Sequence, residues 1–182
     1  MTPAAEITAL FQAHGEDAYF GEDVTQLAHA LQAADWATRA GADEETIVAA
    51  LIHDIGHLLE GQRHAEIGVI DHDAVAERWL TDRGFSPRLI QLVRGHVDAK
   101  RYQVAVNPEY RNKLSEASKQ TLALQGGPMS EAEANAFATH PLFREMIRLR
   151  QWDELAKEPS ATPPPWSQYE AMIERVWQAS RN

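Results

Sequence analysis

A histidine, an aspartate and a second histidine occur close together at His53, Asp54 and His57. Imidazole nitrogens and carboxylate oxygens are ligands that first-row metal ions take in proteins, so this pattern points to metal chemistry. The alternative is a core histidine that simply hydrogen-bonds inside an apolar helix. Burying an ionised aspartate beside it, among leucines and isoleucines, costs several kcal/mol unless a cation compensates the charge. The adjacent pair therefore favours a metal.

The other histidines of the chain fall into two groups. His29, His72 and His96 lie in or next to helical patterns, and His29 or His96 alone would be a buried core histidine more often than a ligand. The rest are expected at the surface or at helix ends: His14, His64 and His140. The His-x-x-x-His spacing also occurs in zinc proteases, but here aspartate stands where those enzymes have glutamate, which argues against that class.

The elements that must position these residues are helices. Serine, threonine or aspartate caps and prolines open the apolar periodic stretches, and glycines close several of them. The pattern predicts helices over residues 3–14, 25–40, 43–60, 74–83, 86–102 and 141–156, with others starting at Ser115, Ser130 and Ser167. The last two starts have the Ser-x-x-Glu capping box. No alternating strand pattern occurs, so the sequence predicts an all-α fold.

Length and composition limit the classes of protein further. At 182 residues the chain is expected to form a single domain, 1–182, with its core at about 19–154 and a proline-rich connector and final helix at 158–182. It has no cysteine, which excludes disulfides, iron–sulfur clusters and a cysteine nucleophile. A net charge of −10 argues against nucleic-acid binding. Neither a secretory signal nor a membrane-spanning run is evident, so we expect a cytoplasmic protein without a membrane partner.

The order histidine, His-Asp, aspartate resembles the signature of the HD-domain superfamily. Here it consists of His29, His53-Asp54 and Asp153, each on a predicted helix. The resemblance implies an HD-domain helical bundle that binds metal. Adding His72 and His96 gives six nitrogen and oxygen ligands, enough for two metals bridged by Asp54. Such a set without thiolate suits iron or manganese better than copper(I) or structural zinc.

Most HD proteins are metal-dependent phosphohydrolases, but this chain resembles a smaller branch, the mixed-valent diiron oxygenases that act on hydroxyphosphonates. The segments that carry this resemblance are YFGE at 19–22, QLAH at 26–29, ALIHDIGH at 50–57, GHVDAKRY at 95–102, LSEASKQTL at 114–122, QGGPM at 125–129 and WDE at 152–154. It implies a mixed-valent Fe(II)/Fe(III) pair that uses O2 to cleave the C–P bond of a 1-hydroxy-2-(amino or trimethylammonio)ethylphosphonate. The expected products are phosphate and glycine or glycine betaine.

The same resemblance implies roles for individual residues. One iron would be held by His29, His53, Asp54 and Asp153, and the other by Asp54, His72 and His96. Tyr19 would cap an iron until substrate displaces it, and Glu22 would meet the substrate's cationic nitrogen. The phosphonate would be held by His57, Lys100, Ser118 and Thr121. Lysine, histidine and hydroxyl groups also suit a phosphonate dianion on chemical grounds, because charge-assisted hydrogen bonds are the strong ones.

Each of these assignments has a simpler alternative. Lys100 could be a solvated cation on an amphipathic helix, although its place four residues after His96 favours the site. Ser118 could serve only a cap at Ser115, and Thr121 could be helix surface. Tyr19 and Glu22 could be loop residues, with Glu22 acting on a helix dipole.

Two further features bear on the substrate. The stretch from Gly61 to His72 departs from the family pattern, which leaves primary amine and trimethylammonium substrates open. Tryptophans could form a cation–π cage, although core positions are expected for them: Trp36, Trp79, Trp152, Trp166 and Trp177. The alternative activity is phosphoester hydrolysis, and a binding or regulatory module without chemistry is a third class.

Overall fold

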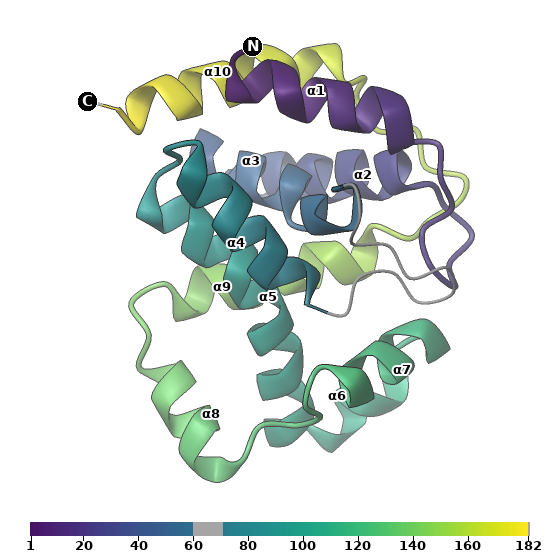
Figure 1. Cartoon of the computed structure of the whole chain (residues 1–182). Helices are drawn as coiled ribbons and strands as arrows, with labels where there is room; N and C mark the ends of the chain where they lie inside the picture. The colour runs from purple at the N-terminus through teal and green to yellow at the C-terminus, as the bar shows by residue number, and fades with distance from the viewer. Residues whose placement is uncertain (60–70, 182) are drawn as a thin grey trace.

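The computed structural model describes residues 1–59 and 71–181. Within these ranges the regular elements are helices, with one isolated bridge between Ala18 and Thr25, so the all-α prediction is confirmed. The helices are α1 Pro3–His14, α2 Gln26–Arg39, α3 Glu44–Ile52, the 3₁₀ turn η1 Ile55–His57, α4 His72–Asp82, α5 Pro87–Val106, α6 Pro108–Lys113, α7 Glu116–Leu124, α8 Glu131–Ala138, α9 Phe143–Leu155 and α10 Ser167–Ala179 (Figure 1). None of them is long and apolar enough to cross a membrane.

Helices α2, α3, α5 and α9 form the centre of the bundle. Helix α2 packs on α3 and α9, and α5 packs on α3, α4 and α9. Their inward faces carry fully buried leucines such as Leu51, Leu92 and Leu149, whose removal from water drives this packing. The N-terminal caps are those expected from sequence: the Thr25, Asp43 and Ser86 side chains each accept a hydrogen bond from a backbone N–H three residues on.

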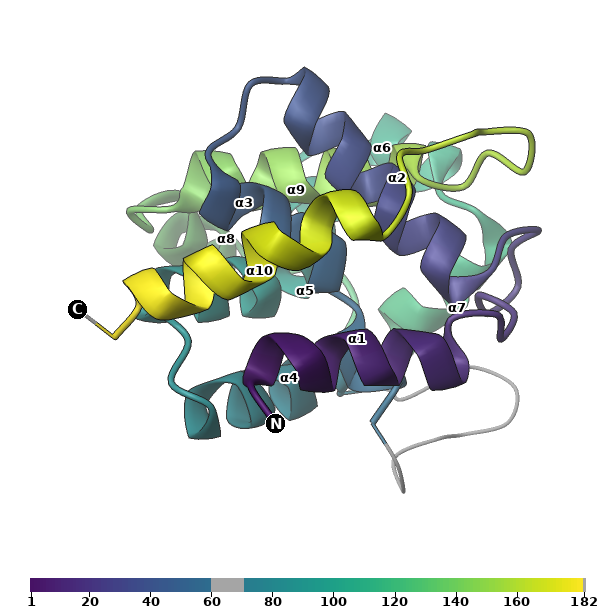
Figure 2. The ribbon, with the colours of Figure 1, turned by 90° about the horizontal axis from the view of Figure 1, so that it is seen from above.

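The two ends of the chain close one side of this bundle. Helices α1 and α10 lie side by side, and α10 also packs on α3 (Figures 1 and 2). Tyr169 and Ile173 of α10 are fully buried there. The capping box predicted at Ser167 and Glu170 is wrong, because α10 begins after Trp166 and has no side-chain cap. The box at Ser130 and Glu133 is confirmed.

The third predicted helix, 43–60, is too long. The α-helix ends at Ile52, His53 is its C-cap, and Asp54 leaves the helical conformation with φ −99° and ψ 12°. The chain then makes the short turn η1, which lies directly against the start of α4. A Cβ on Gly56 would be 2.0 Å from the carbonyl oxygen of His72, so only glycine allows this approach.

Other boundaries differ less from the sequence-based expectation. Helix α5 continues to Val106, beyond the predicted end at Tyr102, and the short α6 was not predicted. Helix α4 begins at His72 itself. Residues 60–70 lie outside the described part of the chain. They include His64 and most of the stretch from Gly61 to His72 that departs from the family pattern.

Candidate metal centre and substrate pocket

The first cluster of possible metal ligands joins three helices. It consists of His29 from α2, His53 at the end of α3 and Asp153 from α9, all buried. His29 Nε2 lies 3.2 Å from His53 Nε2 and 3.3 Å from Asp153 Oδ1. Atoms that close together, from elements far apart in sequence, form a site that one metal ion can occupy.

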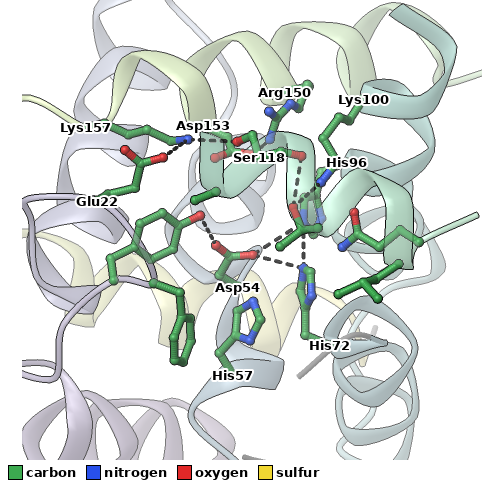
Figure 3. A pocket seen from close by; sticks show the side chains of 16 residues that line it. Glu22, Asp54, His57, His72, His96, Lys100, Ser118, Arg150, Asp153 and Lys157 are labelled. Carbon is green, nitrogen blue, oxygen red and sulfur yellow. Dashed lines mark hydrogen bonds and ion pairs between the residues drawn. The ribbon is translucent and has the colours of Figure 1, made fainter. Parts of the chain in front are cut away.

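A second cluster lies beside the first. It contains Asp54, His72 at the start of α4 and His96 from α5. His72 Nε2 is 3.0 Å from His96 Nε2 and 3.1 Å from Asp54 Oδ1 (Figure 3).

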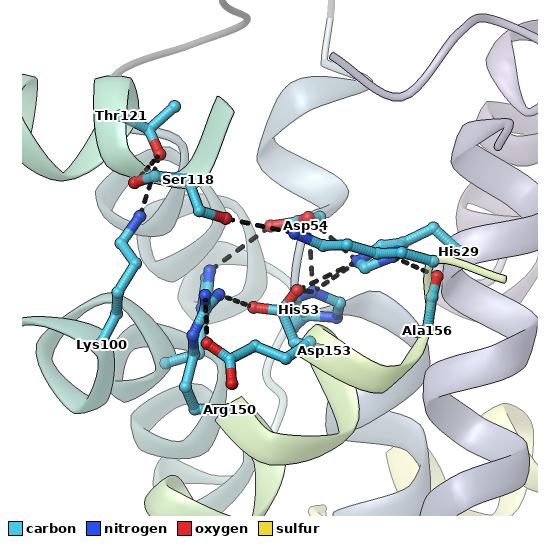
Figure 4. Close-up of polar contacts among 12 residues, drawn as sticks. His29, His53, Asp54, Lys100, Ser118, Thr121, Arg150, Asp153 and Ala156 are labelled. Carbon is cyan, nitrogen blue, oxygen red and sulfur yellow. Dashed lines mark hydrogen bonds and ion pairs between the residues drawn. The ribbon is translucent and has the colours of Figure 1, made fainter. Parts of the chain in front are cut away.

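Asp54 faces both clusters with different oxygens. Its Oδ2 atom is 3.3 Å from His53 Nε2 (Figure 4). Its Oδ1 atom is 3.1 Å from His72 Nε2 and 3.4 Å from His96 Nε2 (Figure 3). A continuous helix would turn Asp54 about 100° away from His53. The break after Ile52 therefore brings consecutive residues to one centre, and a bridging carboxylate becomes possible.

The orientation of three imidazoles is fixed by backbone carbonyls. Nδ1 of His29 lies 2.9 Å from the carbonyl oxygen of Ala156, and Nδ1 of His53 lies 2.8 Å from that of Ala50. Nδ1 of His96 is 2.6 Å from the carbonyl oxygen of Val93. A carbonyl only accepts, so each Nδ1 donates, and in the neutral ring the Nε2 atom then carries the lone pair that a metal needs.

Asp153 supplies the strongest sign that a cation belongs here. Its Oδ2 atom accepts from Arg150 Nη1, but no hydrogen-bond donor to its buried Oδ1 atom is found in residues 1–59 and 71–181. Burial by itself would raise the pKa of Asp153, yet the charge of Arg150 and the neighbouring histidines holds it well below the usual range. The ionised, unsatisfied oxygen and the aligned Nε2 atoms fit two metal ions with nitrogen and oxygen ligands.

Tyr19 covers the first cluster. Its ring stacks on His29 with centroids 3.9 Å apart, and its hydroxyl donates a 2.8 Å hydrogen bond to Asp54 Oδ2. Burial, reinforced by Asp54, raises the pKa of Tyr19 well above its ordinary value, so the phenol keeps its proton. The phenol oxygen is thus held at the edge of the metal centre.

A pocket opens over the second cluster and Tyr19, between the metal centre and α7 (Figure 3). Lys100 lies in it and donates a 3.0 Å hydrogen bond to the hydroxyl of Thr121 (Figure 4). Burial and then the charge of Arg150 lower the pKa of Lys100 to about 7. His57 stacks on His72 with centroids 4.0 Å apart, and burial and the charge of His72 keep its pKa well below the ordinary value.

The other end of the pocket contains an ion pair. Glu22 Oε1 accepts hydrogen bonds from Lys157 Nζ at 2.9 Å and from Ser115 Oγ at 2.5 Å. Lys157 Nζ also donates to Ser118 Oγ at 3.1 Å. The backbone N–H of Ser118 donates to the Ser115 cap, so Ser118 takes part in the cap through its backbone and lines the pocket through its side chain.

The structure thus brings the twelve predicted site residues into one region. Ten line the pocket, while His29 and His53 lie behind Tyr19 and Asp54. Sequence reasoning missed Lys157, although it follows Asp153 by four residues just as Lys100 follows His96. Arg150, Phe20 and Gln125 were also missed.

The tryptophans and two of the remaining histidines can also be placed. Trp152 is buried, as expected, but Trp36 is 39% exposed, so the core prediction is wrong for it. Among the described residues that line the pocket there is no tryptophan, which leaves the cation–π cage without support. His14 and His140 lie at helix ends, as predicted.

Comparisons with known proteins place these residues in a family. The HD domain model matches residues 26–134. The chain is 39% identical to a [1-hydroxy-2-(trimethylamino)ethyl]phosphonate dioxygenase (glycine-betaine-forming) of Leisingera caerulea, over 93% of this chain and 88% of that protein. It is also 39% identical to a hydroxymethylphosphonate dioxygenase of Gimesia maris, over 95% and 89%, and 37% identical to the uncharacterized protein L432 of Acanthamoeba polyphaga mimivirus, over 97% and 83%. Both the matched range and the His-Asp geometry lead to the same conclusion: the chain belongs to the HD-domain family.

Proposed function

We propose that this protein is an iron-dependent oxygenase that cleaves the C–P bond of a 1-hydroxyphosphonate with O2. The observation that carries the proposal is the pair of ligand clusters linked by the two oxygens of Asp54, beside a pocket that contains Lys100, Arg150 and Lys157. Cations suit an anionic substrate, and the similarity to two phosphonate dioxygenases supports the same substrate class.

The proposed cofactor is a mixed-valent Fe(II)/Fe(III) pair. One iron would be held by His29, His53, Asp54 and Asp153, and the other by Asp54, His72 and His96. The two irons would supply the redox chemistry that activates O2, which amino-acid side chains lack. The buried Oδ1 of Asp153 and the aligned imidazoles support this assignment.

The protein's own residues would bind and orient the substrate. Lys100, His57, Ser118 and Thr121 are proposed to hold the phosphonate, since all four line the pocket beside the second cluster. Tyr19 is proposed to cap the first metal until substrate arrives, and its hydrogen bond to Asp54 supports a place at the metal.

Glu22 is proposed to bind a positively charged nitrogen on the second carbon. The favoured substrate is therefore 1-hydroxy-2-(amino or trimethylammonio)ethylphosphonate, oxidised to phosphate and glycine or glycine betaine. The carboxylate of Glu22 lies in the pocket and already binds one ammonium group, that of Lys157, which supports this role.

Turnover under controlled oxygen tests the proposal. The protein is purified without oxygen, loaded with iron and given hydroxyphosphonates, while phosphate release, O2 consumption and the electron paramagnetic resonance spectrum are followed. We expect phosphate release that requires O2 and a coupled Fe(II)/Fe(III) signal that hydroxyphosphonates perturb. Hydrolysis of phosphoesters without O2, together with intact hydroxyphosphonates, would contradict the proposal and establish the phosphohydrolase alternative.

A further inference from the structure

Lys157 occupies the position at which a substrate nitrogen would meet Glu22. It follows α9, and its ammonium group contacts Glu22 Oε1 at 2.9 Å and Ser118 Oγ at 3.1 Å (Figure 3). It also lies 6.0 Å from the centre of the Tyr19 ring. Lys157 therefore lies between the residues proposed for the two ends of the substrate.

The ion pair is largely withdrawn from water. The side chains of Glu22 and Lys157 are only 13% and 15% exposed. A buried carboxylate without a counter-ion is unfavourable, because it has lost its hydration and gained no partner. In the free enzyme the pocket can still admit water to Glu22, but a bound substrate excludes that water, so the substrate complex needs a cation beside Glu22.

Two kinds of hydroxyphosphonate would satisfy this need in different ways. A substrate with a cationic nitrogen can itself neutralise Glu22, and the released ammonium of Lys157 still has Ser118 beside it, at the phosphonate end of the pocket. An uncharged substrate brings no cation, so it can bind without penalty only while Lys157 remains on Glu22.

We propose that Lys157 is a specificity-determining residue: it is an internal counter-ion of Glu22 that a cationic substrate displaces and an uncharged substrate leaves in place. This inference depends on the proposed function and refines its substrate class. It implies that the pocket accepts both kinds of 1-hydroxyphosphonate, and that removing the Lys157 charge restricts it to the cationic kind.

Binding of two matched compounds to Lys157→Met tests the inference. The compounds are 1-hydroxyethylphosphonate, which is uncharged at the second carbon, and 2-amino-1-hydroxyethylphosphonate. Isothermal titration calorimetry without oxygen gives their Kd values for the iron-loaded enzyme. We expect the variant to lose about tenfold or more in affinity for the uncharged compound and less than about threefold for the amino compound. Lys157→Arg, which keeps the charge, should restore binding of the uncharged compound.

The controls separate this inference from the function on which it depends. Lys119→Met removes a lysine of α7 that pairs with Glu116 outside the pocket, and should change neither Kd. An equal loss for both compounds in Lys157→Met, or no loss for either, would overturn the role of Lys157 alone. If the unmodified enzyme bound neither compound and released no phosphate from them, the proposed function itself would be wrong.

Discussion

At the scale of single residues, Asp54 links the two ligand clusters. Because its two oxygens face different histidine sets, Asp54→Ala should lower the metal content from two ions per chain to fewer than one. Metal analysis after gel filtration measures this. Asp98→Ala, on α5 and 40% exposed, serves as the control and should keep both ions. Two ions retained in Asp54→Ala would show that each cluster binds metal without the bridge.

Lys100 gives the site a pH dependence. With a pKa of about 7, its ammonium form dominates at lower pH and is lost as the pH rises. If the ammonium binds the phosphonate, the apparent Kd should rise about tenfold per pH unit above about pH 8. Lys100→Arg keeps its charge throughout this range, so its Kd should stay nearly constant between pH 7 and 9. If the Kd changed with pH in the same way in both proteins, Lys100 would not be the group that binds the phosphonate.

Tyr19 separates an oxygenase from a hydrolase. A capping phenol would only obstruct a hydrolase, whereas it would protect a ferrous ion from O2 in the absence of substrate. Tyr19→Phe should therefore speed the substrate-free oxidation of the mixed-valent enzyme several-fold, as followed by the decay of its coupled Fe(II)/Fe(III) paramagnetic resonance signal. Tyr102→Phe is a matched control, because Tyr102 packs on Phe137 and Phe143 away from the site. Equal oxidation rates in the unmodified protein, Tyr19→Phe and Tyr102→Phe would show that Tyr19 does not protect the metal centre from O2.

Residue types alone pointed to metal at the adjacent His53-Asp54 pair. The other proposed ligands and the proposed substrate-binding residues came from the family resemblance. Lys157 was not found, because it lies beyond the end of α9, where the helical periodicity that relates Lys100 to His96 no longer applies. Its contact with Glu22 joins residues 135 positions apart, which no local pattern reveals.

At the scale of elements, the turn η1 determines where the second cluster forms. Gly56→Ala would place a methyl group against the His72 carbonyl, so it should displace the start of α4 and lower occupancy of the second metal site. Metal analysis and thermal unfolding measure the two effects separately. Gly84→Ala replaces a glycine with φ +73° and open space around it. That control should cost about 1–2 kcal/mol of stability but keep two metals.

The elements themselves were predictable wherever caps and glycines mark them. The helix break after Ile52 was not, because Ile55 and Leu58 continue the apolar stripe of residues 47–51 and no proline or glycine interrupts it at His53. Tertiary contacts determine the position of the break instead, because the turn places Asp54 between the histidines and packs Gly56 against α4. The unpredicted α6 is only six residues long, too short for a periodic signal.

At the scale of the whole molecule, the metal ions would act as cross-links. The six proposed ligands come from α2, the α3–η1 turn, α4, α5 and α9, so ions bound there stabilise the folded chain but not the unfolded one. Chelation of metal should lower the melting temperature by several degrees, and added Fe(II) should restore it. A single unfolding transition in calorimetry, before and after chelation, would also support the predicted single domain. Two resolved transitions would contradict it.

The positions of the ligands along the chain have a consequence for biosynthesis. Asp54, His72 and His96 have all left the ribosome well before Asp153 is translated. The nascent chain thus contains every ligand of the second cluster while the first cluster still lacks Asp153. The cluster of His29 and His53 can be completed only after α9 has been made, so a metal ion would find this full ligand set only at the end of synthesis.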